Sequence, residues 1–556
     1  MKKVSLGTTD FKEIIDNNHY FVDKTLIVKE FLEDSGKIVL IPRPRRFGKT
    51  FNLSILRYFL EKKKEDTSYL FKGTKIEGFK EIMKKQGKYP LIYITFKDDK
   101  HREFESFLGI MKYKIADIYE KFGYIYEKLS PKDKKYFDSI VNLECEQFLL
   151  ETSLFKLSEF LNTYHNQKVI ILIDEYDTPI HEGYFNGYYS EIIGFMRNFL
   201  SSALKDNINL EKAMLTGILR VAKESIFSGL NNLAIYTILN EGYSDKFGFT
   251  EIEILELLKY YNLDSQLNEF KKWYNGYIFG STTIYNPWSV LSYINEPSRY
   301  FMPYWVNTSE NKIIKTLLAE GDEEVKLGLE GLYNGGYVES IINEDTVMAD
   351  INSGNENLWS FLLLSGYLKP IDKRFDELMN MFVYKLKIPN IEIKTLYNSI
   401  IAKWFKEGFI ANDFTKMLKA LTIGEIELFE EYFSEYVMNS FSYFDISGKN
   451  PERVYHAFIL GTLVSLSGTH EIVSNRESGL GRYDVSLIPK DINRPGIIME
   501  FKSIRMSSKY TIEDKIHEAI NQVNKKLYDT ELKNRGISLY LLCVNIEFFP
   551  HREVVF

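Results

Sequence analysis

The sequence has few of the features that mark secreted, disulfide-bonded or membrane proteins. Its 556 residues include only two cysteines, Cys145 and Cys543, which provide neither a disulfide framework nor the spacing of a zinc site. The N-terminal residues lack the apolar stretch of a signal peptide, and no apolar run approaches the roughly 20 residues that span a bilayer. We therefore expect a cytoplasmic protein that does not enter a membrane.

Strong charge of one sign, internal repeats and low-complexity linkers are absent as well. The net charge is -7, so the surface as a whole does not attract nucleic acid, and any nucleic-acid site must be a local basic patch. Hydrophobic residues make up 45% of the chain and charged residues 26%, which is ordinary for a folded protein. The chain is too long for one hydrophobic core, and we expect roughly two to four domains.

A candidate phosphate-binding loop lies between the apolar run at residues 38–41 and a helical pattern. Its sequence is Arg43-Pro44-Arg45-Arg46-Phe47-Gly48-Lys49-Thr50. A strand, a tight turn and a helix N-terminus together form an anion site, because the free N–H groups and the helix dipole face the anion. In this interpretation Lys49 reaches the β- and γ-phosphates of ATP, Thr50 holds Mg²⁺, and Arg46 and Gly48 contribute to nucleotide binding. Arg43 stands where the usual pattern has its first glycine.

A second sequence pattern typical of a nucleotide-binding site lies further along the chain. Residues 169–173 are apolar and are followed by Asp174 and Glu175. The pattern predicts a strand buried on both faces, with Asp174 at the sheet edge where α/β proteins place ligands. Asp174 would then complete the Mg²⁺ shell, and Glu175 would polarise the water that attacks the γ-phosphate. The alternative is that both carboxylates merely end a strand. Asp177 or Thr178 is expected to cap a helix with Pro179 in its first turn.

Further strands are expected at residues 91–96 and 212–218, which gives a parallel sheet with helical crossovers. Thr216, at the end of its strand, is a candidate sensor of the γ-phosphate beside Asp174. Arg220 is a candidate phosphate-contacting arginine. For both residues the alternative, a strand-end polar residue or a solvated charge, stays open.

The middle of the chain is expected to be mostly helical. The helical pattern extends from about residue 249 to 341, interrupted by the aromatic loops at 273–277 and 304–307, which we interpret as packing rather than as a base-stacking platform. A helix at 357–365, an extended segment at 382–388 and a helix from Glu392 are compatible with a winged-helix module. Spacing alone does not establish that module.

The C-terminal part carries a second set of candidate catalytic residues. Asp484 lies in a strand pattern at residues 482–488, and Glu500 and Lys502 lie in another at 496–502, where alternation places them on one face. Two carboxylates from adjacent strands can hold Mg²⁺, which activates water and stabilises charge on a phosphodiester. Lys502 would orient that water or act as a base. A surface ion pair is the alternative. Glu452, in the first turn of a helical pattern at residues 451–466, is a further catalytic candidate, for which the helix dipole is the alternative explanation.

Several segments of the sequence resemble segments of two known protein families. The N-terminal part resembles the bacterial AAA-ATPase-like family, and the C-terminal part resembles the PD-(D/E)XK nuclease superfamily branch fused to it. The N-terminal resemblance lies in residues 21–25, 43–50, 174–177, 216–218, 227–233 and 273–276. The C-terminal resemblance lies in residues 474–484 and 500–502, with Gln522 and Tyr528. It implies an α-β-β-β-α-β nuclease core with Gln522 on a helix beside the site, and the ATPase family itself has arginine at the position of Arg43.

The expected fold is therefore α/β throughout, with four parts. These are a P-loop ATPase with a parallel sheet at 1–245, a helical lid-like region at 246–350, a candidate winged helix at 351–415 and a nuclease-like domain at 416–556. The expected function is ATP hydrolysis joined to Mg²⁺-dependent cleavage of nucleic acid, DNA more than RNA, with oligomerisation left open. The alternative is a nucleotide-switched DNA-binding or signalling scaffold whose nuclease fold does not cut.

Overall fold

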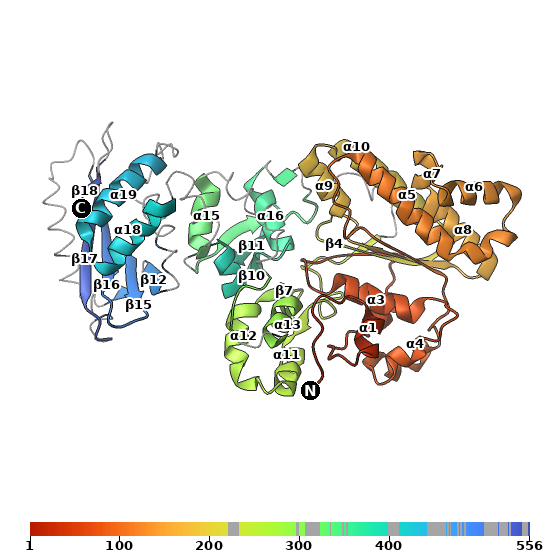
Figure 1. The fold of residues 1–556 in the computed structure, drawn as a ribbon, viewed down its shortest axis with the longest axis horizontal. Helices are drawn as coiled ribbons and strands as arrows, with labels where there is room; N and C mark the ends of the chain where they lie inside the picture. The colour runs from red at the N-terminus through yellow and green to blue at the C-terminus, as the bar shows by residue number, and fades with distance from the viewer. Residues whose placement is uncertain are drawn as a thin grey trace. The chain divides into compact units, whose positions relative to one another are not determined.

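The computed structural model places the chain in two compact units, which are described separately (Figure 1). The first comprises Met1–Leu317 and Tyr337–Ile393, and the second comprises Leu318–Gly336 and Lys394–Phe556. The residues that the structure describes are 1–220, 233–295, 300–305, 323–333, 335–346, 350–351, 354–397, 411–441, 463, 466, 469–474, 477–478, 481–482, 485–504, 521, 532, 535–547 and 554–555.

A five-stranded parallel sheet forms the centre of the first unit and contains all four strands expected from the sequence. The strand order is β2-β3-β4-β1-β5, and every pairing is parallel. All side chains of β1 and β3 are buried, because both faces of these strands are covered. The strands are β1 (Ile38–Pro42), β2 (Leu91–Thr95), β3 (Val169–Asp174), β4 (Leu210–Gly217) and β5 (Leu233–Ile235).

Helices cover both faces of this sheet, so the expected α/β sandwich is confirmed (Figure 1). A large apolar core joins one face of the strands to the helices α5, α6, α8 and α10. The helices on the other face include α3, which begins directly after the candidate phosphate loop. The helices named here are α3 (Lys49–Leu60), α5 (Phe104–Lys121), α6 (Pro131–Val141), α8 (Ser153–His165) and α10 (Tyr189–Leu204), with α1 (Phe11–Asp16), α2 (Ile27–Glu33) and α4 (Lys80–Met83) beside α3.

The region after residue 248 combines helices with a small antiparallel sheet that the sequence pattern did not predict. The sheet has the order β6-β8-β7, and its strands are only two to four residues long, too short to show a period of two. The aromatic loops do pack, as expected: Trp273 stacks on Phe301, and Trp305 lies against Tyr367. The elements are β6 (Phe249–Thr250), α11 (Glu251–Tyr260), α12 (Leu267–Tyr274), β7 (Tyr277–Phe279), β8 (Thr282–Tyr285) and α13 (Pro287–Asn295).

Residues 337–393 contain the expected helix and strand pair, with one strand more. The antiparallel sheet has the order β10-β11-β9, and residues 391–397 are helical. A helix, a strand pair and a second helix occur as expected, whereas the winged-helix assignment and the four domain boundaries stay predictions. The elements are β9 (Val338–Ile341), α16 (Asn355–Leu364), β10 (Lys369–Asp376) and β11 (Met381–Lys387).

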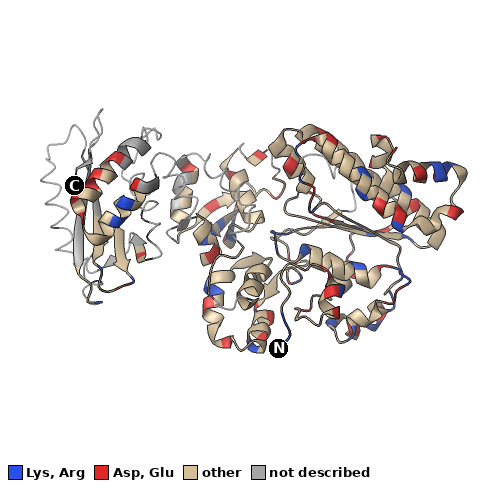
Figure 2. Cartoon of the chain, viewed as in Figure 1, with Lys and Arg blue, Asp and Glu red and all other residues tan. Residues whose placement is uncertain are grey.

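The second unit is also α/β. Its main sheet has the order β12-β15-β16-β17-β18, in which only β16 and β17 are parallel. Figure 2 shows Lys and Arg interspersed with Asp and Glu on the described helices, in keeping with the modest net charge of -7. The elements are α15 (Glu323–Tyr333), α18 (Ala411–Ile423), α19 (Ile426–Phe441), β12 (His470–Ser474), β13 (Glu477–Ser478), β14 (Gly481–Arg482), β15 (Val485–Pro489), β16 (Gly496–Ile504), β17 (Leu539–Glu547) and β18 (Val554–Val555).

Candidate functional site

The candidate phosphate loop has the geometry of an anion site. It joins the buried strand β1 to α3, a helix of 12 residues that begins at Lys49. Gly48 precedes the helix with φ +85°, a left-handed conformation that glycine adopts without strain. No side chain caps this helix N-terminus. Its first N–H groups and the positive end of the dipole are therefore available to an anion.

Arg43, at the position of the usual first glycine, has a structural role. Its side chain is fully buried and does not line the cavity beside the loop. The guanidinium donates to the carbonyl oxygens of Pro42 at 2.9 Å and Tyr236 at 2.6 Å, and it faces the rings of Phe247 and Phe279. Burial lowers the pKa of Arg43 to about 9. Arg43 thus fastens the start of the loop to the segment after β5 instead of facing a phosphate.

Lys49 lies inside the curve of the loop. Its ammonium donates to the carbonyl oxygens of Arg43 at 3.0 Å and Pro44 at 3.2 Å. Burial lowers the pKa of Lys49, while the nearby carboxylates, of which Glu175 is the strongest, oppose that shift. The lysine is therefore held by the backbone of the loop itself.

Thr50 and Asp174 meet as the sequence predicted. The Thr50 hydroxyl donates to Asp174 Oδ2 at 2.7 Å, and the Thr216 hydroxyl donates to Asp174 Oδ1 at 2.7 Å. The strand order explains this meeting, because β4 lies between β3 and β1 and all three strands end at the same edge. Thr216 thus lies beside Asp174, as expected, whereas its role as a sensor of the γ-phosphate stays a prediction.

Glu175 has an unusual backbone conformation for a residue other than glycine. Its φ is +52°, and left-handed conformations of this kind occur often at functional sites. Its amide donates to the Thr216 hydroxyl at 3.4 Å, and its side chain lines the cavity. Burial raises the pKa of Glu175, and Lys49 opposes the rise.

Asp177 occupies the N-cap position of α9 (Thr178–Asn186), with Pro179 in the first turn, as expected, but its side chain makes no capping hydrogen bond. Its carboxylate instead accepts from the backbone amides of Ile218 at 2.7 Å and Leu219 at 3.0 Å. The approach is so close that a Cβ on Gly217 would lie 2.7 Å from Asp177 Oδ1. Asp177 therefore ties the end of β3 to the chain that leaves β4.

Arg220 is not brought to the cavity. It forms an ion pair with Asp345 at 2.7 Å, and it is not among the residues that line the cavity. A phosphate contact by Arg220 stays a prediction, and these contacts do not favour it.

A cavity of about 450 Å³ lies beside the loop, and we call it the loop cavity. Its walls come from parts of the first unit that are distant in the sequence. One wall carries the phosphate loop with Glu175, another the N-terminal segment 5–9, and a third Trp288 with Leu291. The lining residues used below are Lys24, Arg45, Arg46, Gly48, Lys49, Thr50, Lys97, Asp98, Lys100, Glu175, Thr178, Lys246 and Trp288.

The structure describes little of the candidate nuclease site. Asp484, Glu452 and Gln522 lie outside the described residues. The backbones of Glu500 and Lys502 lie in β16, opposite Cys543 and Asn545 of β17. The described side chains include no group of three His, Cys, Asp or Glu residues that could hold a metal ion.

Comparison with known proteins separates the same two parts. Residues 5–227 match the AAA-ATPase-like family, described as a predicted AAA-ATPase, and residues 450–555 match the PD-(D/E)XK nuclease superfamily. The chain joins an AAA-ATPase-like domain to a PD-(D/E)XK nuclease-superfamily domain. It is also 23% identical over 553 residues to an uncharacterized protein in the vnfD 5′ region of Azotobacter chroococcum mcd 1, covering 98% of this chain and 96% of that protein.

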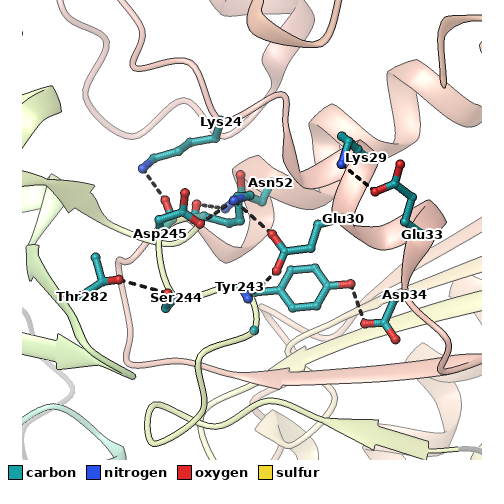
Figure 3. Close-up of polar contacts among 12 residues, drawn as sticks. Lys24, Lys29, Glu30, Glu33, Asp34, Asn52, Tyr243, Ser244, Asp245 and Thr282 are labelled. Atoms are coloured by element: carbon teal, nitrogen blue, oxygen red, sulfur yellow. Dashed lines mark hydrogen bonds and ion pairs between the residues drawn. The ribbon is translucent and has the colours of Figure 1, made fainter. Parts of the chain in front are cut away.

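A polar network of the first unit joins several of the residues that line the loop cavity (Figure 3). Lys24 pairs with Glu253 at 2.6 Å and donates to the carbonyl oxygen of Asp245 at 2.8 Å. Lys246 pairs with Glu30 at 3.0 Å, and its carbonyl oxygen accepts from Asn52. Burial lowers the pKa of Lys24. The network attaches segment 243–246 to α2 and to α3, the helix that begins at the phosphate loop.

The sequence pattern did not identify Trp288, Lys97 or Lys100 as residues of the loop cavity. Trp288 shares a helix-forming pattern with many core positions, and Lys97 and Lys100 read as surface charge after a strand. Lys24 differs from these three residues, because it belongs to the segment 21–25 that resembles the AAA-ATPase-like family. Among the described residues, no helix combines the length and the apolar character that crossing a membrane requires.

Proposed function

We propose that this protein binds MgATP in the loop cavity and hydrolyses it, and that its C-terminal domain is a Mg²⁺-dependent nuclease acting on nucleic acid, DNA more than RNA. The observation that carries the ATPase proposal is the 2.7 Å contact between Thr50 and Asp174 at the edge where the phosphate loop ends. The two residues are 124 positions apart in the chain and meet where a magnesium-bound phosphate needs both.

The donor set around Asp174 suits Mg²⁺. The carboxylate is fully buried, and it accepts hydrogen bonds from the hydroxyl groups of Thr50, Thr216 and Thr95. Mg²⁺ prefers carboxylate and hydroxyl oxygens together with water. In this proposal Thr50 and Asp174 hold the ion, which neutralises charge on the β- and γ-phosphates.

The other loop residues bind and orient the triphosphate. Lys49 exchanges its two carbonyl partners for the β- and γ-phosphates, while the backbone around Gly48 and the guanidinium of Arg46 contribute further donors. Glu175 polarises the attacking water, and its raised pKa moves it towards the range in which a carboxylate serves as a base near neutral pH.

The ATPase proposal is tested by Lys49→Ala, with Lys132→Ala as a matched control on the exposed first turn of α6. Calorimetry with MgATP should show that Lys49→Ala weakens binding at least tenfold and abolishes hydrolysis, because the phosphates lose their central charge partner. The control should retain both. Unchanged ATP affinity in the Lys49 variant would contradict the proposal.

The nuclease proposal is supported by the family match and by strand pairing. In the antiparallel pair β15–β16, Val485 is opposite Met499, and these residues directly follow Asp484 and precede Glu500 in the sequence. Asp484 and Glu500 would hold Mg²⁺, and Lys502 would orient the water. Gln522 is proposed to assist on the strength of the family resemblance, and Glu452 on the strength of its helical sequence pattern alone.

The test of this activity uses linear and circular DNA and RNA with Mg²⁺ or with EDTA. Wild-type protein should cleave DNA with Mg²⁺ and not with EDTA, and Glu500→Gln should abolish cleavage while the protein stays folded. If the wild-type protein cuts nothing but its DNA affinity changes with ATP, the nucleotide-switched scaffold replaces the nuclease.

A further inference from the structure

The loop that follows β2 lines the phosphate side of the loop cavity. Lys97, Asp98 and Lys100 belong to this loop, and they line the same cavity as Glu175 and Thr178. The strand β2 is the direct neighbour of β3, so the loop leaves the sheet next to the carboxylates of Asp174 and Glu175. It therefore leaves the sheet at the edge that carries the two residues proposed to hold the metal ion and to polarise the attacking water.

The beginning of this loop is fastened to Asp174. The amide of Phe96 donates to the backbone carbonyl oxygen of Asp174 at 2.9 Å. The Thr95 hydroxyl lies 3.5 Å from Asp174 Oδ2, the oxygen that also accepts from Thr50, and it accepts from the amide of Lys97 at 3.3 Å. The backbone amide of Lys97 is thus connected through the Thr95 hydroxyl to the residue proposed to hold the metal ion.

The end of the loop is fastened to two helices. Asp99 is buried, at 2% exposure, and pairs with Lys114 of α5 at 2.8 Å, while Lys114 also donates to the carbonyl oxygen of Thr95. The carbonyl oxygen of His101 accepts from the Tyr188 hydroxyl at 2.7 Å and from the Asn186 amide at 3.3 Å. The backbone of the loop is therefore held at both ends, while the side chains of Lys97 and Lys100 are exposed. A charged group carried by a backbone that is already in position stabilises charge with less reorganisation.

The charges of the loop favour an interaction with the phosphates of a bound nucleotide. Asp99 is neutralised by Lys114, so Lys97, Asp98 and Lys100 are the charged groups that this loop presents to the cavity. Arg220, which the sequence suggested as a phosphate-contacting arginine, is paired with Asp345 and does not line the cavity.

We propose that Lys97, supported by Lys100, is the cation that this chain supplies to the γ-phosphate during ATP hydrolysis. This inference rests on the proposed ATPase function. In the reaction the water oxygen forms a bond to the γ-phosphorus as the bond from that phosphorus to the β–γ bridging oxygen breaks. The products are ADP and inorganic phosphate, and a water proton passes by way of Glu175 to solvent or to the phosphate. The Lys97 ammonium stabilises the charge on the γ-phosphoryl oxygens as the bond breaks.

The test separates binding from catalysis. Lys97→Ala should lower kcat about 10²-fold, as removal of one preorganised donor does, while the KM for ATP and the affinity for ADP change less than threefold. The affinity for ADP with aluminium fluoride, which mimics the transition state, should fall as far as kcat does. Lys97→Arg should restore part of the rate, and Lys100→Ala should have a smaller effect. Lys132→Ala is the control, and retained ADP binding shows that each variant is folded.

Asp98 provides a second test. Asp98→Asn should keep or raise kcat, because the change removes a negative charge beside the γ-phosphate. A loss as large as that of Lys97→Ala would assign the loop to water or metal binding and would overturn the inference. The inference would also be overturned if the Lys97/Lys100 double alanine variant kept its kcat and its affinity for ADP with aluminium fluoride. In that case the ATPase proposal would stand. Wild-type protein that neither binds nor hydrolyses ATP would instead overturn both.

Discussion

The guanidinium of Arg46 lies over the indole ring of Trp288, 3.8 Å from the ring centroid. Arg46 belongs to the phosphate loop, and Trp288 is the second residue of α13. Both residues line the loop cavity. The phosphate loop is therefore in direct contact with the helix that forms the far wall, through a cation–π pair that a triphosphate would compete for.

The first prediction concerns this pair. Binding of MgATP should draw the Arg46 guanidinium toward phosphate and change the environment of Trp288, so intrinsic tryptophan fluorescence should change on titration. Trp288→Phe should lose most of that change while it retains ATP binding measured by calorimetry. Trp273→Phe, which lies outside the cavity wall, is the control and should keep the change. An equal signal in the two variants would rule out this use of Trp288.

The second prediction concerns Arg43. Although Arg43→Gly restores the glycine of the usual loop pattern, it should destabilise the protein by on the order of 3 kcal/mol without improving ATP affinity. The reason is that the change leaves a cavity and removes the donors to the Pro42 and Tyr236 carbonyl oxygens. Thermal melting compared with Lys132→Ala measures the loss. A variant as stable as wild type with tighter ATP binding would show that Arg43 has no structural role.

The third prediction concerns communication between the two domains. Glu175→Gln should bind ATP and fail to turn it over, which traps the bound state. We expect the trapped protein to differ from the nucleotide-free form in nuclease rate or in DNA affinity, because a ligand that interacts differently with two states shifts their populations. Fluorescence anisotropy with labelled DNA and cleavage assays measure the two quantities. Equal values in both states would mean that the domains are only tethered.

The fourth prediction concerns Glu392, a fully buried carboxylate in the first unit. Its oxygens accept from the Ser289 hydroxyl at 2.8 and 3.0 Å and from the Trp305 amide at 2.7 Å. Burial raises its pKa to about 7, above the value of about 4.3 expected in the unfolded chain. The folded state thus binds the proton more tightly, and the stabilisation that protonation provides is full below about pH 4 and is lost as pH rises through about 7.

Glu392→Gln removes this titration, so its melting temperature should fall less between pH 6 and pH 8 than that of wild type. Glu105→Gln, an exposed residue at the start of α5, is the control and should follow the wild-type profile. Parallel profiles for all three proteins would show that Glu392 does not titrate in this range.

The fifth prediction concerns the nuclease-superfamily domain. Lys502→Ala should leave Mg²⁺ binding nearly intact and lower the cleavage rate, since the lysine acts on the water rather than on the metal. The basic residues that follow in the sequence would contact phosphates without reading bases, so DNA affinity should fall steeply with salt. These residues are Arg505, Lys509, Lys515, Lys525 and Lys526, which lie outside the described residues. Salt-independent binding, or loss of metal binding in Lys502→Ala, would contradict this assignment.

The sequence by itself determined the parallel sheet and the residues that meet at its edge. Continuous apolar runs are stable as strands only when both faces are covered, and parallel strands end at a common edge. From those two rules, Lys49, Thr50 and Asp174 could be assigned to one site before their geometry was known. The short strands β6, β7 and β8 were not predicted, because two to four residues are too few to show the alternation of a strand.

Tertiary structure alone decided which direction the other polar side chains take. Arg43, Asp177 and Arg220 each lie near the phosphate loop or the strand ends in sequence, yet their partners are Tyr236, Ile218 and Asp345. Lys97 and Trp288 reach the loop cavity from a loop and a helix whose residues look ordinary in the sequence. The physical reason is that a buried polar or charged group takes the nearest partner that the fold supplies, and that partner comes from chain folded back from elsewhere in the sequence.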